Sequence, residues 1–157
     1  MTAKTMNGRP IAILMADDDP DDRELTREAF AEARVATDVR FVADGVELMD
    51  YLHRRGPFAD PAVAPRPGLI LLDLNMPRKD GRECLADIKA DPKLRGIRVI
   101  VLTTSKAEED IVRSYELSAS SYITKPVTFD ALVDVIQTLG KYWLEIVELP
   151  DADRDGG

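Results

Sequence analysis

Four apolar runs in this sequence are each followed by a side chain that could do chemistry. The runs and the residues after them are 11–16 with Asp17 and Asp18, 69–72 with Asp73, 97–102 with Thr103, and 121–124 with Lys125. The carboxyl ends of parallel strands meet at one edge of a sheet, which is where open α/β sheets bind ligands. If the runs are such strands, we expect these side chains to form one site.

These residue types suit a divalent cation together with a phosphoryl group. The carboxylates of Asp17, Asp18 and Asp73 would repel one another, and an oxygen-only set of this kind suits Mg²⁺, or Mn²⁺ in its place. Lys125 and the hydroxyl of Thr103 would supply positive charge and a donor for an anion. A phosphoryl group bonded to Asp73 fits this arrangement, with the carboxylate as the nucleophile of an in-line displacement.

Neighbouring candidates have simpler interpretations. We interpret Asp19, Asp21 and Asp22 as a solvated helix start, where acidic side chains favour the helix dipole. His53 is the single histidine and is expected to be solvated, so no transition-metal cluster is indicated. The single Cys84 lies in an apolar pattern and is expected to be a core thiol.

Five apolar segments alternate with helical patterns along the chain. The expected strands are 11–16, 39–42, 69–72, 97–102 and 121–124, and the expected helices begin near residues 20, 45, 81, 106 and 129. Such alternation implies parallel strands joined by right-handed crossovers, with helices on both faces. The expected fold is a three-layer α/β/α sandwich with a five-stranded parallel sheet in flavodoxin-like order.

Local signals predict where two helices begin. Asp19 before Pro20 is typical of an N-cap followed by proline at the first helical position. Asp44, with Glu47 three residues later, predicts a carboxylate variant of the capping box. The inner face of the first helix is expected to consist of Leu25, Ala29, Phe30 and Ala33.

Residues 56–68 interrupt the alternation with four prolines in thirteen residues. Proline fixes φ and lacks an N–H donor, so the segment is expected to be an ordered or semi-extended loop. Its length leaves two interpretations open, an interaction surface or a tolerated surface insertion.

Composition limits the class of protein. The chain has 157 residues, is 45% hydrophobic and 32% charged, and has a formal net charge of -8. The acidic balance argues against nonspecific binding to nucleic acid or anionic membranes. No run approaches the ~20 apolar residues of a membrane span, and no signal peptide is visible, so the cytoplasm is the expected compartment.

Five motifs in order resemble the receiver domain of two-component response regulators, over residues 11–139. They are the acidic pair in Leu14-Met15-Ala16-Asp17-Asp18-Asp19-Pro20, the segment Leu72-Asp73-Leu74-Asn75-Met76-Pro77 with Asp80-Gly81, Val101-Leu102-Thr103, and Tyr122-Ile123-Thr124-Lys125-Pro126. Each motif alone is weak evidence for this family, whereas the five motifs in this order are strong evidence. The resemblance implies a signalling protein rather than an enzyme, which accepts a phosphoryl group on Asp73 from a sensor histidine kinase.

The same resemblance implies a role for each site residue. Asp18, Asp73 and the Asn75 carbonyl would be Mg²⁺ ligands, with Asp17 assisting through water. Lys125 and Thr103 would contact the phosphoryl group, and Tyr122 would be the aromatic switch. The Lys125-Pro126 peptide bond would be cis. The chain departs from the usual pattern at Thr104, where a smaller residue is common, and this departure would alter access to the phosphate.

A narrower resemblance is to the single-domain response regulators associated with bacterial phytochromes. It rests on the proline-bearing loop, residues 103–111 and the ending 142–150. It implies a light-sensing kinase as donor and a homodimer built with the final helix, for which the candidate surface residues are Tyr142, Trp143, Ile146 and Val147. Packing of these side chains onto their own domain is the alternative. The expected organisation is a flexible N-terminus (1–10), one receiver domain with an extended C-terminal helix (11–149) and an acidic tail (150–157).

Two alternatives to a stand-alone phosphoacceptor stay open. An aspartyl-nucleophile phosphatase of the haloacid dehalogenase type would carry a second acid two residues after the nucleophile, where this chain has Asn75. A receiver-like scaffold that binds a partner without being phosphorylated would keep the fold. An FMN carrier is disfavoured, because acids follow the first strand where a phosphate cradle is needed.

Overall fold

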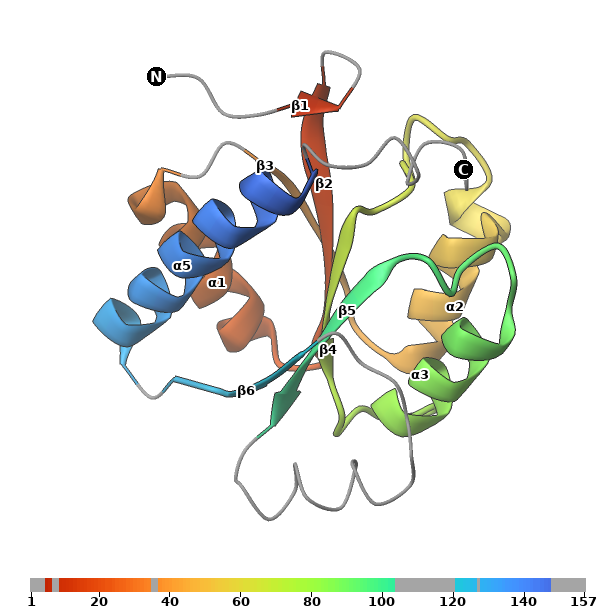
Figure 1. Ribbon diagram of the computed structural model, residues 1–157. Coiled ribbons are helices and arrows are strands. Elements are labelled where there is room, and N and C mark those ends of the chain that lie inside the picture. The colour runs from red at the N-terminus through yellow and green to blue at the C-terminus, as the bar shows by residue number, and fades with distance from the viewer. Residues whose placement is uncertain (1–4, 7–8, 35–36, 104–120, 127, 148–157) are drawn as a thin grey trace.

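A computed structural model of the chain describes residues 5–6, 9–34, 37–103, 121–126 and 128–147 (Figure 1). Its parallel strands are β2 (Arg9–Ala16), β3 (Thr37–Val42), β4 (Leu69–Asp73), β5 (Arg98–Thr103) and β6 (Ser121–Thr124). They pair in the order β3, β2, β4, β5, β6, and every pair is parallel. This order confirms the predicted flavodoxin-like sheet.

Four described residues, 5–6 and 9–10, lie in the segment 1–10 that was expected to be flexible. A two-residue strand β1 (Thr5–Met6) pairs antiparallel with Arg9 and Pro10 at the beginning of β2. Backbone N–H and C=O groups find partners wherever two extended segments lie side by side. Residues 5–6 and 9–10 therefore belong to the sheet, although the sequence pattern did not predict a strand there.

The helices are α1 (Pro20–Ala33), α2 (Gly45–His53), α3 (Gly81–Ala90) and α5 (Phe129–Val147), with a short 3₁₀ helix η1 (Gly56–Phe58). Polar side chains cap the first turns of α1 and α2, as predicted. Asp19 accepts a hydrogen bond from the Asp21 N–H at 2.9 Å, and Asp44 accepts one from the Glu47 N–H at 2.8 Å. Glu47 itself reaches back to the Ala43 N–H rather than to that of Asp44. No helix within the described ranges has the length and apolarity that a membrane span requires.

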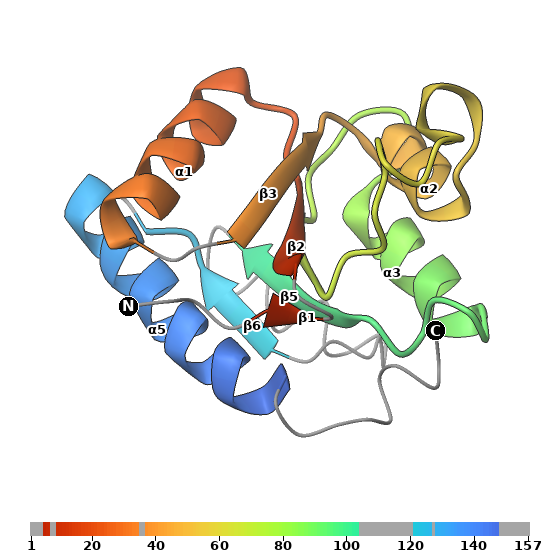
Figure 2. The ribbon, with the colours of Figure 1, turned by 90° about the horizontal axis from the view of Figure 1, so that it is seen from above.

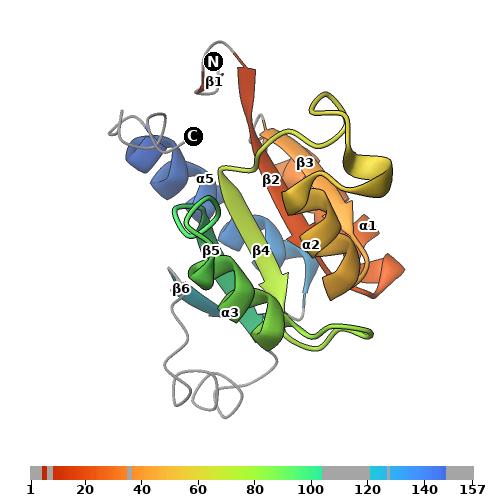
Figure 3. The same ribbon diagram turned by 90° about the vertical axis from the view of Figure 1, so that its right-hand side faces the viewer.

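The helices form a layer on each face of the sheet. α1 and α5 cover one face, and α2 and α3 cover the other (Figures 1 and 2). Figure 3 views the molecule from the side of α2 and α3, which lie in front of the sheet. All five residues of β4 are buried, as expected of a central strand covered on both faces.

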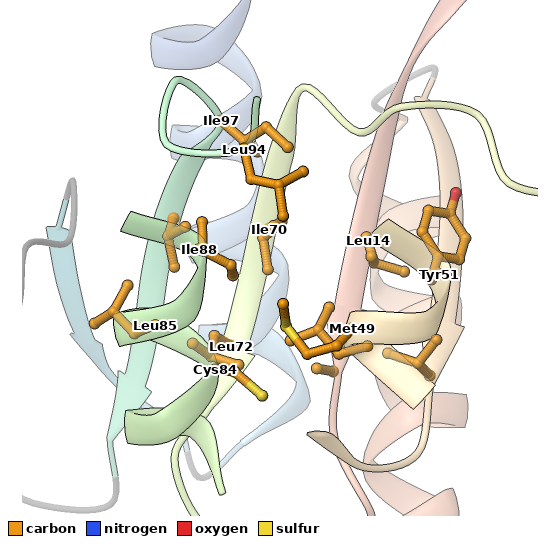
Figure 4. Close-up of a cluster of buried hydrophobic side chains, with 14 of the residues drawn as sticks. Leu14, Met49, Tyr51, Ile70, Leu72, Cys84, Leu85, Ile88, Leu94 and Ile97 are labelled. Carbon is orange, nitrogen blue, oxygen red and sulfur yellow. The ribbon is translucent and has the colours of Figure 1, made fainter. Parts of the chain in front are cut away.

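Two hydrophobic cores hold these layers together. Leu14, Ile70 and Leu72 of the sheet pack against side chains of α2 and α3 in the core of Figure 4. Cys84 belongs to this core and is fully buried, which confirms the predicted core thiol. The opposite core joins the sheet to α1 and α5.

The inner face of α1 corrects one prediction. Ala29, Phe30 and Ala33 are buried as expected, but Leu25 is 40% exposed and Thr26 is buried in its place. Side chains on one helical face recur three or four residues apart, and Thr26 lies one turn before Ala29 and Phe30. Leu25 is therefore rotated away from the centre of this face.

The loop at 56–68 is ordered, mainly through its carbonyl oxygens. Arg40 Nη1 donates to the Val63 carbonyl at 2.6 Å, Arg54 Nε donates to that of Ala64 at 3.1 Å, and the Tyr51 hydroxyl donates to that of Pro65 at 2.8 Å. Ala64 and Pro67 are buried beneath this part of the chain. The prediction of an ordered loop is thus confirmed.

Candidate functional site

Three aspartates lie together at the carboxyl edge of the sheet. Asp17 follows β2 and Asp73 ends β4, and these two strands are neighbours with Ala16 paired to Leu72. Each of Asp17, Asp18 and Asp73 offers a carboxylate oxygen within 4.8 Å of the others. Asp17 is 0% exposed and Asp73 is 4% exposed, whereas Asp18 is open to solvent.

The two buried carboxylates are oriented by their own turns. Asp17 Oδ1 accepts from the Asp19 N–H at 2.9 Å, and Asp73 Oδ1 accepts from the Asn75 N–H at 3.0 Å. Such turns, in which an aspartate binds the backbone two residues on, fix the side chain locally. In both residues the second oxygen, Oδ2, is then directed to Lys125.

Lys125 is the cation of the site. Its Nζ lies 3.2 Å from Asp17 Oδ2, 3.1 Å from Asp73 Oδ2 and 3.1 Å from Asp22 Oδ2. Asp22 was interpreted from sequence as part of a solvated helix start. Its contact with Lys125 makes it a site residue that sequence reasoning missed. The available signal was its spacing, because Asp22 lies one helical turn before the buried Thr26.

Burial governs the electrostatics of the site. Burial raises the pKa of Asp73 and of Asp17, since the charged forms lose solvation, while Lys125 and the backbone donors act in the opposite direction. Burial alone would lower the pKa of Lys125, but the carboxylates of Asp73 and Asp17 outweigh it and the pKa rises. Negative charge thus exceeds positive charge among these groups.

This donor set fits a divalent cation. Carboxylate oxygens are the preferred ligands of Mg²⁺ and Mn²⁺, and a cation would relieve the repulsion between the buried Asp17 and Asp73. The residues that could hold it are Asp17, Asp18 and Asp73. Asn75 lies beside them through its N–H bond to Asp73, and the role of its carbonyl as a ligand stays a prediction.

α3 begins directly against the end of β4. The Gly81 N–H donates to the Leu74 carbonyl at 2.9 Å, and a Cβ on Gly81 would lie 2.5 Å from the Asp73 carbonyl oxygen. Only glycine lets the helix approach this closely. The intervening loop is tied to α2, because Arg78 Nε pairs with the α2 cap residue Asp44 at 2.9 Å.

The remaining predicted residues are placed only in part. Thr103 ends β5 and pairs with Thr124, and Tyr122 lies on β6 opposite Val101, but their side chains fall outside the described atoms. Thr104 lies outside the described residues. Tyr142, Trp143, Ile146 and Val147 belong to α5, and their side chains are likewise not described. His53 is exposed, as expected.

The expected cis peptide bond is wrong for this structure. No peptide bond in the described ranges is cis, so Lys125 and Pro126 are joined in trans. The trans form of a bond before proline is intrinsically favoured by about 0.5–1 kcal/mol. In this form Lys125 Nζ already lies within 3.2 Å of its carboxylate partners.

Comparisons with known proteins agree with the fold described above. The family description of the response regulator receiver domain matches residues 13–137. The chain is 41% identical over 143 residues to the response regulator Rcp1 of Synechocystis sp., covering 91% of this chain and 95% of that protein.

Three solved structures are similar in both sequence and fold. The phosphorylated cyanobacterial phytochrome response regulator RcpA is 44% identical, with a TM-score of 0.76 and coverage of 86% of this chain and 94% of that one. The Mn²⁺-bound form of Rcp1 is 41% identical, with a TM-score of 0.75 and coverage of 90% and 99%. The bacteriophytochrome response regulator RtBRR is 40% identical, with a TM-score of 0.73 and coverage of 83% and 78%.

Proposed function

We propose, because this chain belongs to the response regulator receiver domain family, that Asp73 accepts a phosphoryl group from the phosphohistidine of a sensor histidine kinase. One observation carries the proposal: the carboxylate of Asp73 belongs to the acidic cluster that fits a cation, and its Oδ2 also lies 3.1 Å from the ammonium of Lys125. A nucleophile in this position has both a cation and a lysine to neutralise an incoming phosphoryl group.

The transfer is an in-line displacement at phosphorus. A carboxylate oxygen of Asp73 forms the new O–P bond while the P–N bond of the phosphohistidine breaks. The imidazole nitrogen keeps the electron pair of the broken bond and takes up a proton. Lys125, with the predicted contact from Thr103, holds the phosphoryl oxygens. Asp17, Asp18 and Asp73 would hold Mg²⁺, which would neutralise part of the phosphoryl charge.

The proposed donor is a phytochrome-type kinase, and the proposed cation is Mg²⁺. The names of RcpA and RtBRR support a phytochrome-type kinase as the donor, because both are phytochrome response regulators of similar sequence. The Mn²⁺-bound form of Rcp1 supports a divalent cation. The added charge on Asp73 would shift the region of Thr103, Thr104 and Tyr122, and a protein partner in the cytoplasm would read the change.

The decisive experiment is phosphorylation by a small donor. Incubation with Mg²⁺ and acetyl phosphate should add one phosphoryl group, measured by intact-protein mass. Asp73→Asn should abolish this label, and Asp19→Asn should keep it, because asparagine caps α1 as well as aspartate does. Transfer from a phosphorylated bacterial phytochrome kinase to the same variants tests the donor.

Three results would contradict the proposal. Label that persists in Asp73→Asn would place the phosphoryl group elsewhere. An unlabelled protein that still binds Mg²⁺ would favour the scaffold. Sustained turnover of phosphate esters would favour the phosphatase, which is disfavoured by Asn75 at the position of the general acid.

A further inference from the structure

The ammonium of Lys125 has three N–H donors, and the structure directs it to three carboxylates. Two of these, Asp17 and Asp73, belong to the cluster that fits a cation, whereas Asp22 does not. Asp22 lies in the first turn of α1, and its side chain is 41% exposed. It is therefore the partner of Lys125 that a bound cation would leave unneutralised.

The side chain of Lys125 is positioned by charge more than by packing. It borders a cavity of about 70 Å³ between α1 and α5, whose lining includes Leu25, Leu132 and Leu139. Empty space beside a flexible four-carbon stem leaves room for other rotamers. The position of Nζ thus depends on which anions surround it, and Asp22 is one of three.

We propose that Asp22 competes with the phosphoryl group on Asp73 for the ammonium of Lys125, and so limits how tightly the site holds that group. This inference rests on the proposed function of Asp73. Asp22 acts as a positioning residue through Lys125, because its Oδ2 contacts Lys125 Nζ at 3.1 Å and does not contact the reacting carboxylate of Asp73.

Charge supports competition. A phosphoryl group on Asp73 and the carboxylate of Asp22 are two anions that would face the same ammonium of Lys125. The Asp22 carboxylate also adds negative charge near a second anion, which opposes binding of that anion. Asparagine in its place keeps a carbonyl oxygen that can accept from Lys125 but removes the charge, so the geometry is preserved while the competition weakens.

The test measures binding of beryllofluoride, which stands in for the phosphoryl group, by NMR titration of the full chain with Mg²⁺. Asp22→Asn should bind it about fivefold more tightly than the wild type, the size expected for one partly screened charge nearby. Asp21→Asn is the matched control, because Asp21 is exposed on the same helical turn and is not among the three partners of Lys125; it should stay within about twofold. Asp22→Glu restores the charge and should return the affinity toward the wild-type value.

Two further readouts separate competition from a structural role. The gain in Asp22→Asn should shrink in 1 M salt, where the Debye length is only about 3 Å. In metal-free protein the Nζ and Cε resonances of Lys125 should move in Asp22→Asn and stay in Asp21→Asn, and this result does not depend on phosphorylation. Wild type that binds no beryllofluoride overturns the proposed function. Wild type that binds it with the same or higher affinity than Asp22→Asn overturns the role of Asp22.

Discussion

Individual residues of the site were predictable where a strand pattern pointed to them. Asp17, Asp73 and Lys125 were found because each follows an apolar run, and the parallel register then brings them together. Asp22 was not predicted to belong to the site, because an acidic residue in the first turn of a helix is commonly explained by its favourable interaction with the helix dipole. Its contact with Lys125 depends on how α1 is rotated against the sheet, and that rotation is set by the buried Thr26, Ala29 and Phe30.

Cys84 offers a prediction with a definite pH dependence. Burial raises the pKa of its thiol from 9.0 to about 12. At pH 8 the folded protein therefore holds roughly a thousandfold less thiolate than an ordinary cysteine, since each pKa unit is tenfold. A disulfide reagent such as DTNB should label the native protein at least about a hundredfold more slowly than the urea-unfolded protein.

The raised pKa of the Cys84 thiol also determines how stability depends on pH. Because the thiol loses its proton more readily in the unfolded chain, stability should fall as the pH rises above 9.0. Cys84→Ser is the control variant: its difference in stability from the wild type should change with pH in this range. Rapid labelling of the native protein at pH 8 would contradict burial of the thiol.

At the scale of elements, the junction between β4 and α3 determines where Asp73 lies. The sequence predicts that a helix begins at Asp80 and Gly81, and α3 begins there with a capping box from Asp80 and Glu83. The close contact of the helix start with the Asp73 carbonyl was not predictable, because it follows from tertiary packing across the loop. Gly81 is therefore a site determinant that carries no functional group.

Gly81→Ala should destabilise the protein by about 2 kcal/mol, because the new Cβ meets the backbone of Asp73 and Leu74 at 2.5 and 2.7 Å. Urea unfolding measures the change as a lower midpoint with an unchanged slope. Phosphorylation by acetyl phosphate should slow as well, since Asp73 is displaced. Gly96→Ala is the matched control, because a Cβ there meets nothing within 4 Å. Equal stabilities of the two variants would rule out the steric role of Gly81.

At the scale of the whole molecule, alternation of strands and helices predicted the fold correctly. The order of the parallel strands follows from right-handed crossovers and from burial of both faces of β4. The antiparallel β1 was not predicted, because a segment of two residues, Thr5 and Met6, is too short to show the alternation that indicates a strand. The helix expected near residue 106 and the domain boundaries at 149 and 150 lie outside the described residues.

Assembly is the remaining prediction at this scale. We propose that the apolar end of α5, with Tyr142, Trp143, Ile146 and Val147, forms a homodimer surface, since the helix runs as far as Val147. Trp143→Glu should weaken dimerisation at least about 30-fold, as expected for an aromatic hot spot. Light scattering coupled to size exclusion measures the mass, and Trp143→Phe should stay dimeric. A Trp143→Glu variant that loses its circular dichroism signal would instead indicate packing onto its own domain, and a monomeric wild type would exclude the dimer.

The anchoring of the 56–68 loop has a consequence for sequence variation. Val63, Ala64 and Pro65 are held through carbonyl oxygens that accept from Arg40, Arg54 and Tyr51. Every amino acid carries that carbonyl, so these anchoring contacts do not depend on the side chains at the exposed positions of the loop, whereas the buried Ala64 and Pro67 are constrained. The exposed positions of this loop can therefore diverge among related proteins, or be altered by a protein engineer to change partner preference, while the domain beneath keeps its shape.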